Sequence, residues 1–344
     1  MRKTTATLLP LVFAAAFLAG CVKDGVLPRR SFERFTQTRD MMGTFVTITA
    51  WAPSAGKAEE ALEAAFDRIA QLEQMMSSYR ADSEVAQVNA GACERPVEVS
   101  PEMMDVLDLA LQYGRLSGGA FDITMAPLWK LWKSAERSGI EPDETAVRSV
   151  LPSVGYQNIK LDRRNRTVRF LKPSMEIDLG GIAKGFAVDR ALEELRRHGV
   201  SAALVEAGGD IATMGTPPGA GGWSVGVRDP ADQARLREVL QFTTAAVCTS
   251  GDYERYVEIG GKRFSHIIDP RTGMPVEDMS SVSVIAPDAA TADALATTCS
   301  VLGPVAGLNL AARMANVEVM YIVAADGDAP VVIKSLGFED YAKN

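Results

Sequence analysis

Apolar residues recur every three or four positions between residues 57 and 79, which predicts an amphipathic helix with one buried face. The residues on that face are Leu62, Phe66, Ile69, Leu72 and Met76, and Tyr79 lies just beyond them. A second helix is predicted over 101–119, because its pattern runs into the glycine pair at 118 and 119. The segment TFVTITAW, at 44–51, reads as an early strand.

From Met175 onward, short strand patterns mix with helical ones. Strands are expected over 175–179, 202–207, 211–215, 223–229, 281–286 and 317–323, with a hairpin across Gly260-Gly261. We expect parallel-type crossovers to join some of them and hairpins to join others. No repeat or long linker interrupts residues 36–340, so the pattern predicts one domain of the mixed α/β (α+β) class, with mixed sheets packed against helices.

The first residues form a secretory signal. Arg2 and Lys3 precede an apolar run, 8–18, that is too short to span a membrane and ends in Leu-Ala-Gly-Cys. This is similar to a bacterial lipoprotein signal peptide, which implies a signal at 1–20, an acylated Cys21 and a tether over 21–35 that holds the protein on a membrane. The alternative is a buried N-terminal helix with an incidental cysteine.

Charge and cysteine content exclude several classes of function. Removal of the signal takes away two basic residues and lowers the formal net charge from −8 to −10, which disfavours nucleic acid as a partner. Cys93, Cys248 and Cys299 would remain, an odd number without CxxC spacing, so one disulfide pair is possible but no zinc site is indicated. Two histidines exclude a histidine-rich metal site, which leaves oxygen ligands.

A helix over residues 289–302 carries two oxygen-bearing side chains one turn apart. Asp288 is a natural N-cap, and Gly303-Pro304 should stop the helix. Asp293 and Thr297 are i and i+4, so their oxygens can converge, and the helix has no Lys, Arg or Glu. This pattern suits a hard cation; a solvated helix face is the alternative.

A glycine turn precedes another helix. A strand ends at Asp178, Gly180-Gly181 makes a tight turn, and Lys184 lies in the first helical turn. Free N–H groups at such a helix start bind anions, so we expect a phosphate site here. The alternative is a packing turn capped by Asp178. Neither GxGxxG nor GxxxxGK occurs, so Rossmann and P-loop sites have no support.

Further motifs lie in order along the chain. After the lipoprotein signal they are Met42-Gly43-Thr44, Tyr79-Arg80, Ala120-Phe121-Asp122, IDLGGIAKGFAVD, AGGDI, TSGDYER, SHIIDPRTG and ADALATT. Taken together, in this order and spacing from about residue 38 to 338, the sequence resembles the ApbE family, the FAD:protein FMN transferases.

The resemblance implies an enzyme that binds FAD, splits its pyrophosphate with Mg²⁺, joins the FMN half to a Thr or Ser of another protein and releases AMP. It implies that Asp293, Thr297 and the main-chain carbonyl of Gly181 hold Mg²⁺. Lys184 and the helix start would hold the phosphates. The remaining FAD contacts that it implies are Met42, Tyr79, Ala120, Phe121, Asp122, Asp178 and Ile267.

His266 is the side chain in these motifs that titrates near neutral pH, so we expect it to accept the proton of the acceptor hydroxyl, with Asp269 orienting it. Alternatively it only hydrogen-bonds the loop or the ligand. Lys184 departs from the acid that some family members carry at this position. Gly181 offers only its backbone, which implies that the metal binds mainly together with the nucleotide.

By resemblance, the acceptor is a subunit of a membrane-bound redox complex, and the protein lies on the periplasmic side of the bacterial membrane, with the inner membrane favoured. The chain has no Ser/Thr-Gly-Ala-Ser/Thr acceptor sequence of its own. Two other functions stay open. An Mg²⁺-dependent FAD pyrophosphatase would use water as the nucleophile and give free FMN, and a non-catalytic flavin-binding lipoprotein would need neither the Asp293/Thr297 pair nor His266.

Overall fold

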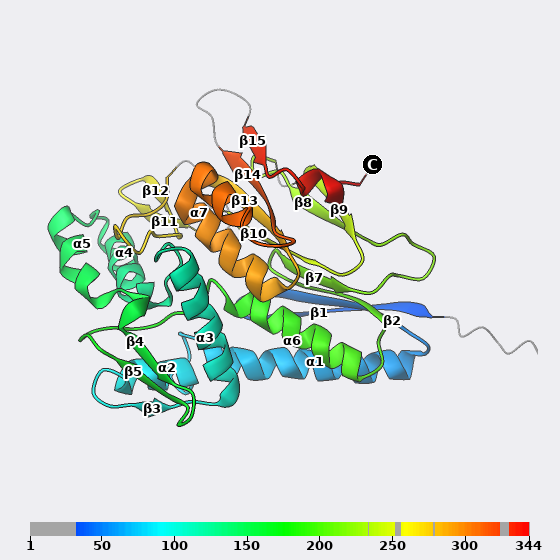
Figure 1. Ribbon diagram of the computed structural model, residues 1–344, viewed down its shortest axis with the longest axis horizontal. Helices are drawn as coiled ribbons and strands as arrows, with labels where there is room; N and C mark the ends of the chain where they lie inside the picture. Colours follow the sequence, from blue (N-terminus) through cyan, green and yellow to red (C-terminus); the bar gives the residue numbers. More distant parts are fainter. Residues whose placement is uncertain (1–31, 233, 252–255, 278, 324–329, 344) are drawn as a thin grey trace, which may run out of the picture. The chain divides into compact units, whose positions relative to one another are not determined.

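An eight-stranded sheet forms the centre of the computed structural model, which describes residues 32–232, 234–251, 256–277, 279–323 and 330–343 (Figure 1). The strand order is β1-β2-β6-β7-β10-β13-β14-β15. Their bounds are β1 Glu33–Met41, β2 Thr44–Ala52, β6 Ala202–Ala207, β7 Asp210–Met214, β10 Ala246–Gly251, β13 Met279–Ala286, β14 Glu318–Val323 and β15 Val331–Lys334. The predicted strand at 44–51 is thus confirmed as β2.

Three smaller sheets accompany the large one. β3 (Val97–Glu98), β5 (Thr167–Phe170) and β4 (Ile159–Asp162) form a three-stranded sheet. β8 (Trp223–Arg228) pairs with β9 (Leu236–Phe242), and β11 (Tyr256–Ile259) pairs with β12 (Lys262–Ser265) across the expected Gly260-Gly261 turn. The β8–β9 hairpin packs on one face of the large sheet, where its buried Leu240 joins Val247 and Ile285.

The opposite face of the large sheet is covered by helices α1 (Ala55–Met76), α6 (Ala183–Arg197) and α7 (Ala289–Ala311). α6 lies between α1 and α7 and contacts both (Figure 1). The remaining helices are α2 Glu84–Gly91, α3 Pro101–Leu116, α4 Ala126–Ser138 and α5 Glu144–Val150. α1 and α3 confirm the two predicted helices, and the side chains of Ser54 and Ser100 cap their first turns.

The strand expected at 175–179 is wrong. This segment has no strand neighbour among the described residues, and the amide side chain of Asn89 bonds its backbone instead. The Asn89 oxygen accepts the N–H of Ile177 at 2.7 Å, and its nitrogen donates to the carbonyl of Ile177 at 3.0 Å. A side-chain amide therefore replaces the sheet partner.

The expectation of parallel-type crossovers is also wrong, since every strand pair in the described part of the chain is antiparallel. β13 and β14 are antiparallel neighbours although α7 joins them, so the chain must return to the end of the sheet where α7 began. A break at Gly303, with φ 72° and ψ 174°, allows this return. The predicted stop at Gly303-Pro304 is confirmed as a break, after which a second helical segment reaches Ala311.

The predicted N-terminal features lie largely outside the described residues. This holds for the signal at 1–20, for Cys21 and for most of the tether, whereas residues 33–35 already belong to β1. Cys93, Cys248 and Cys299 all lie in the described part and are free thiols, so the possible disulfide is not formed. By length and composition α7 could cross a membrane, but here half of its most apolar stretch is buried in the fold.

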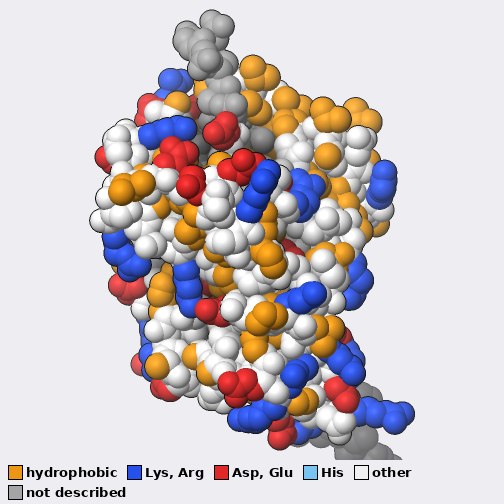
Figure 2. Space-filling model, turned by 90° about the vertical axis from the view of Figure 1, so that its left-hand side faces the viewer, with side chains coloured by type: hydrophobic (Ala, Val, Ile, Leu, Met, Phe, Trp, Pro, Cys, Tyr) orange, Lys and Arg blue, Asp and Glu red, His pale blue; other side chains and the backbone are white. Residues whose placement is uncertain are grey.

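The surface seen in Figure 2 mixes both signs of charge. Lys and Arg side chains are interspersed there with Asp and Glu side chains. An anionic ligand on this face would therefore be held by local groups rather than by a broad basic field.

Gly185 allows the close contact between α6 and α7. A Cβ at Gly185 would meet the carbonyl oxygen of Ala289 well inside contact distance and the Cβ of Asp293 at 2.8 Å. We expect Gly185→Ala to lower the free energy of unfolding by about 1–3 kcal/mol, because the neighbour is backbone and cannot move aside. Gly56→Ala is the control, since its Cβ would enter open space on α1 and should not destabilise the protein. Equal stability of the two variants in urea unfolding would contradict the close contact.

Candidate functional site

Three predicted site residues meet at the glycine turn before α6. A Cβ on Gly181 would lie 3.2 Å from the hydroxyl oxygen of Thr297 and 3.2 Å from Cε2 of Phe121. The turn is closed by the N–H groups of Ile182 and Ala183, which donate to the carbonyl of Leu179 at 3.0 and 2.8 Å. The structure thus brings together residues that are widely separated in the sequence.

A buried cluster of charges lies next to this turn. The ammonium of Lys184 forms an ion pair with Asp210, the first residue of β7. The N–H of Gly185 donates to Oδ2 of Asp293 at 3.0 Å. Asp210 and Asp293 are only 1% and 4% exposed, so two carboxyl groups share a space from which water is nearly excluded.

Burial sets the proton content of this cluster. It raises the pKa of Asp293 to about 7, the charge of Asp210 adds to that shift, and Lys184 opposes it. Burial also raises the pKa of Asp210 against the attraction of Lys184. For Lys184, burial works to lower the pKa, but Asp210 and Asp293 outweigh it and raise the pKa above its usual value. Near neutral pH, therefore, Lys184 is charged, and burial beside Asp210 brings the pKa of Asp293 into this range.

These residues fit a hard cation. Asp293 and Thr297 offer oxygen atoms one helical turn apart, with Thr297 beside Gly181 and Asp293 beside Gly185, and a cation could replace a proton on Asp293. No three His, Cys, Asp or Glu side chains come together as metal ligands within the described residues. A cation here would therefore need main-chain and substrate oxygens as well, which is typical of Mg²⁺.

The expected phosphate site at the start of α6 has fewer free donors than the sequence suggested. Ile182, Ala183 and Gly185 use their N–H groups within the protein, and Gly180 donates to Oδ1 of Asp178 at 2.7 Å. Asp178 thus caps the turn, as the alternative interpretation held. The ammonium of Lys184 is bound to Asp210, so contact of Lys184 with a phosphate stays a prediction.

Met42 lies at the same end of the sheet as Asp210. It occupies the β1–β2 turn with φ 55°, followed by Gly43 with φ 69°. The neighbouring Thr44 is close to Gly208, where a Cβ would lie 2.5 Å from the Thr44 hydroxyl, and Gly208 belongs to the turn before Asp210. A left-handed conformation is uncommon for a residue other than glycine and is concentrated at functional sites.

The carboxylate of Asp122 is fully used within the protein. One oxygen accepts the N–H of Thr124 at 2.8 Å and its hydroxyl at 2.6 Å, and the other accepts the N–H of Tyr156 at 2.7 Å. Burial raises the pKa of Asp122, and these donors oppose the shift. Ala120 and Phe121 are also buried, at 1% and 3% exposure. Asp122 therefore joins two loops, and a ligand contact of its own stays a prediction.

The loop that carries His266 follows β12 and borders a cleft of about 390 Å³. Residues from the two loops joined by Asp122 and from the His266 loop line this cleft, among them Gly119, Asp122, Tyr156, Pro270 and Arg271. His266 is half-buried and Ile267 is buried. Both carboxylate oxygens of Asp269 accept hydrogen bonds from the guanidinium of Arg271, at 2.9 and 2.8 Å, so Asp269 is engaged within its own loop.

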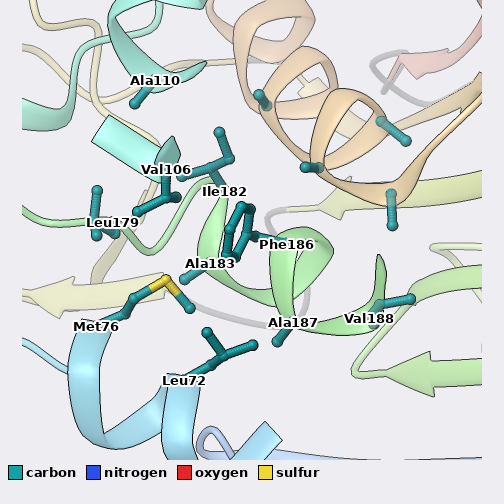
Figure 3. Close-up of a cluster of buried hydrophobic side chains, with 14 of the residues drawn as sticks. Leu72, Met76, Val106, Ala110, Leu179, Ile182, Ala183, Phe186, Ala187 and Val188 are labelled. Atoms are coloured by element: carbon teal, nitrogen blue, oxygen red, sulfur yellow. The ribbon is translucent and has the colours of Figure 1, made fainter. Parts of the chain in front are cut away.

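Tyr79 follows α1 and is 88% exposed. Met76, three residues earlier, packs beside Leu179 and Ala183 (Figure 3). The chain therefore leaves α1 close to the start of α6, where Tyr79 is accessible to a ligand. Residues 252–255 of the TSGDYER motif lie outside the described residues.

Sequence reasoning missed Asp210 as a member of the site. Its motif, AGGDI, was noticed, but a charge at the start of a strand usually reads as a turn residue. The only available signal was the glycine pair before it, and the pairing with Lys184, 26 residues away, depends on the tertiary structure.

Comparison with known proteins places the chain among flavin transferases. Residues 42–321 match the ApbE family. The FAD:protein FMN transferase of Treponema pallidum (strain Nichols) is 34% identical over 310 residues, which cover 86% of each chain. The ApbE protein of Thermotoga maritima has a TM-score of 0.82 at 30% identity and covers 91% of this chain and 100% of its own. The flavin transferase ApbE of Vibrio cholerae gives 0.79 at 28%, with 90% and 100% covered.

The buried Asp293 predicts a pH dependence of stability without metal. Its pKa is about 7 in the folded protein and 3.8 as a reference, so the folded state binds the extra proton between these values. The free energy of unfolding should therefore fall as pH rises from about 4 to 7. Asp293→Asn should reduce this slope by up to about 1.4 kcal/mol per pH unit. Urea unfolding in EDTA at pH 5, 6 and 7 measures the slope, and an unchanged slope in the variant would disprove the assignment.

Proposed function

The chain belongs to the ApbE family, and on that basis we propose that it transfers the FMN half of FAD to a Thr or Ser hydroxyl of a target protein. The observation that carries the proposal is that Thr297 lies against the glycine turn before α6 while Asp293 contacts Gly185 in the first turn of that helix. An oxygen-only set of ligands beside a buried pair of carboxyl groups suits Mg²⁺-assisted cleavage of a pyrophosphate.

In the proposed reaction, the acceptor hydroxyl oxygen forms a bond to the phosphorus of the FMN half. The bond from that phosphorus to the bridging oxygen breaks, and AMP leaves with the electron pair. The hydroxyl proton passes to His266, which lies in the loop bordering the cleft. No oxidant or reductant is needed, because only a phosphoryl bond is exchanged.

Asp293, Thr297 and the carbonyl of Gly181 would hold Mg²⁺. When bound, Mg²⁺ neutralises the pyrophosphate oxygens and stabilises charge on the departing AMP. The ammonium of Lys184 is paired with Asp210, and its positive charge also favours the ionised form of Asp293. Gly185 fixes the second oxygen of Asp293 through its N–H group, which limits the orientations of the carboxylate.

We propose further that Cys21 carries the lipid anchor and that the acceptor is a subunit of a membrane-bound redox complex on the periplasmic side, with the inner membrane favoured. The support is the Leu-Ala-Gly-Cys box after a short apolar run. A membrane anchor would concentrate the enzyme near such an acceptor.

The donor requirement tests the proposed function. FAD with Mg²⁺ should label an acceptor peptide, whereas FMN with Mg²⁺ should not, because FMN would have to expel water or hydroxide in place of AMP. AMP and peptide-bound flavin, measured in one reaction, should appear in equal amounts, and EDTA should abolish both. Release of free FMN at the same rate with and without peptide would instead establish an FAD pyrophosphatase.

His266 and His198 form a matched pair for testing the base. His266→Ala should lower kcat by about 100-fold or more while FAD binding changes little, since a general base contributes roughly that factor. His198 ends α6, where its ring contacts the carbonyl of Glu194 at 3.0 Å, so His198→Ala should keep full activity. If His266→Ala loses FAD affinity and keeps its kcat at saturation, His266 is a binding residue.

A further inference from the structure

The first turn of α7 is held by carboxylates from two helices. Its own N-cap, Asp288, accepts the N–H of Thr291 at 2.8 Å. Asp189, on α6, accepts the N–H of Ala289 through Oδ1 and the N–H of Ala290 through Oδ2, both at 2.8 Å. The first N–H groups of a helix have no partner within it, so a bidentate carboxylate from another helix fixes the start of α7 relative to α6.

The same two helices exchange a second bond in the opposite direction. Gly185, four residues before Asp189 on α6, donates its N–H to Asp293, four residues after Ala289 on α7. Each helix therefore offers a carboxylate acceptor and backbone donors, one from α6 and two from α7. Two such bonds fix both the separation of the helices and the rotation of α7 about its own axis.

A third bond reaches the same turn from α3. The hydroxyl of the buried Tyr113 donates to the hydroxyl of Thr291 at 2.7 Å. The cation ligands Asp293 and Thr297 follow this turn directly on the same helix. A helix radius of about 5 Å means that a rotation of about 10° would move their side chains by roughly 1 Å. A misplacement of that size can cost about 100-fold in rate.

We propose that Asp189 is a positioning residue, which sets the orientation of α7 so that Asp293 and Thr297 face the Gly181 turn. Asp189 touches neither the cation nor the substrate and acts only through the first turn of α7. The inference rests on the proposed function, because it assigns cation binding to Asp293 and Thr297. It gives a role to Asp189, the last residue of the IDLGGIAKGFAVD motif, to which the resemblance assigned none.

Asp189→Asn tests this role. The amide keeps the size of the carboxyl but can accept only one of the two N–H groups. Mn²⁺ binding should be followed by electron paramagnetic resonance with FAD present and no acceptor, at pH 8, above the pKa of about 7 to which burial raises Asp189. We expect the Kd for Mn²⁺ to rise about tenfold, whereas FAD binding without metal should change less than twofold. The Mg²⁺ concentration for half-maximal transfer should rise by the same factor.

Asp143→Asn is the matched control, because Asp143 accepts the N–H of Ala146 at 2.7 Å as the N-cap of α5, away from α7. It should leave Mn²⁺ binding unchanged. Asp189→Glu keeps the charge but shifts the carboxylate oxygens, so it should also weaken Mn²⁺ binding. This variant replaces Asp189→Asn in the test if the Asn variant does not fold. Wild-type Mn²⁺ binding in either folded Asp189 variant would overturn the proposal, as would an equal loss of metal-free FAD binding.

The outcomes separate this inference from the proposed function. If wild-type protein binds Mn²⁺ but transfers no FMN, the proposed function fails. Mn²⁺ binding by wild type and by the Asp189 variants then still tests the positioning role. If wild-type protein transfers FMN and the Asp189 variants bind Mn²⁺ normally, the inference alone fails.

Discussion

The close approach of α6 to α7 at Gly185 is the contact on which the site depends. Because Gly185 has no side chain, the backbone of α6 reaches the carbonyl of Ala289 and the carboxylate of Asp293 directly. This places Lys184, the preceding residue, within reach of Asp210 at the start of β7. Any larger residue would separate the helices, and the charged groups would then lose the partners that make their burial tolerable.

Burying these charges is costly for stability, which argues for a functional reason to keep them. Two carboxyl groups and one ammonium share nearly dry surroundings, and removing one partner of such a set typically costs about 3–5 kcal/mol. Apolar residues of similar volume would fill the same space more stably. The cluster instead raises the pKa of Asp293 to about 7, so its carboxyl group can change protonation state near neutral pH.

Local sequence patterns predicted much of this region, whereas the contacts between residues far apart in the sequence were not predicted. The N-cap Asp288, the i, i+4 pair of Asp293 and Thr297 and the break at Gly303 each depend on neighbours within one or two turns, and the structure confirms the cap and the break. By contrast, Asp189 meets Ala289 across 100 residues, and Asn89 replaces a strand partner for Ile177 across 88. Such pairings follow from packing, which no local period encodes. The 175–179 segment has strand composition, yet Ile177 bonds to the side chain of Asn89, and the N–H of Asp178 donates to the carbonyl of Ile123 outside any sheet.

The distribution of N–H groups at the two helix starts indicates how the site would hold a pyrophosphate. At α6 the donors of Ile182, Ala183 and Gly185 are taken by the protein, and at α7 the donors of Ala289 and Ala290 are taken by Asp189. Helix starts that commonly bind phosphate directly are here used to fix carboxylates. In the proposed reaction, a cation held by Asp293 would therefore add to the few remaining N–H groups in attracting a pyrophosphate. The hydrogen bonds of Gly185 to Asp293 and of Ala289 and Ala290 to Asp189 fix α6 and α7 relative to each other, and the proposed function needs that fixed arrangement to orient Asp293 and Thr297.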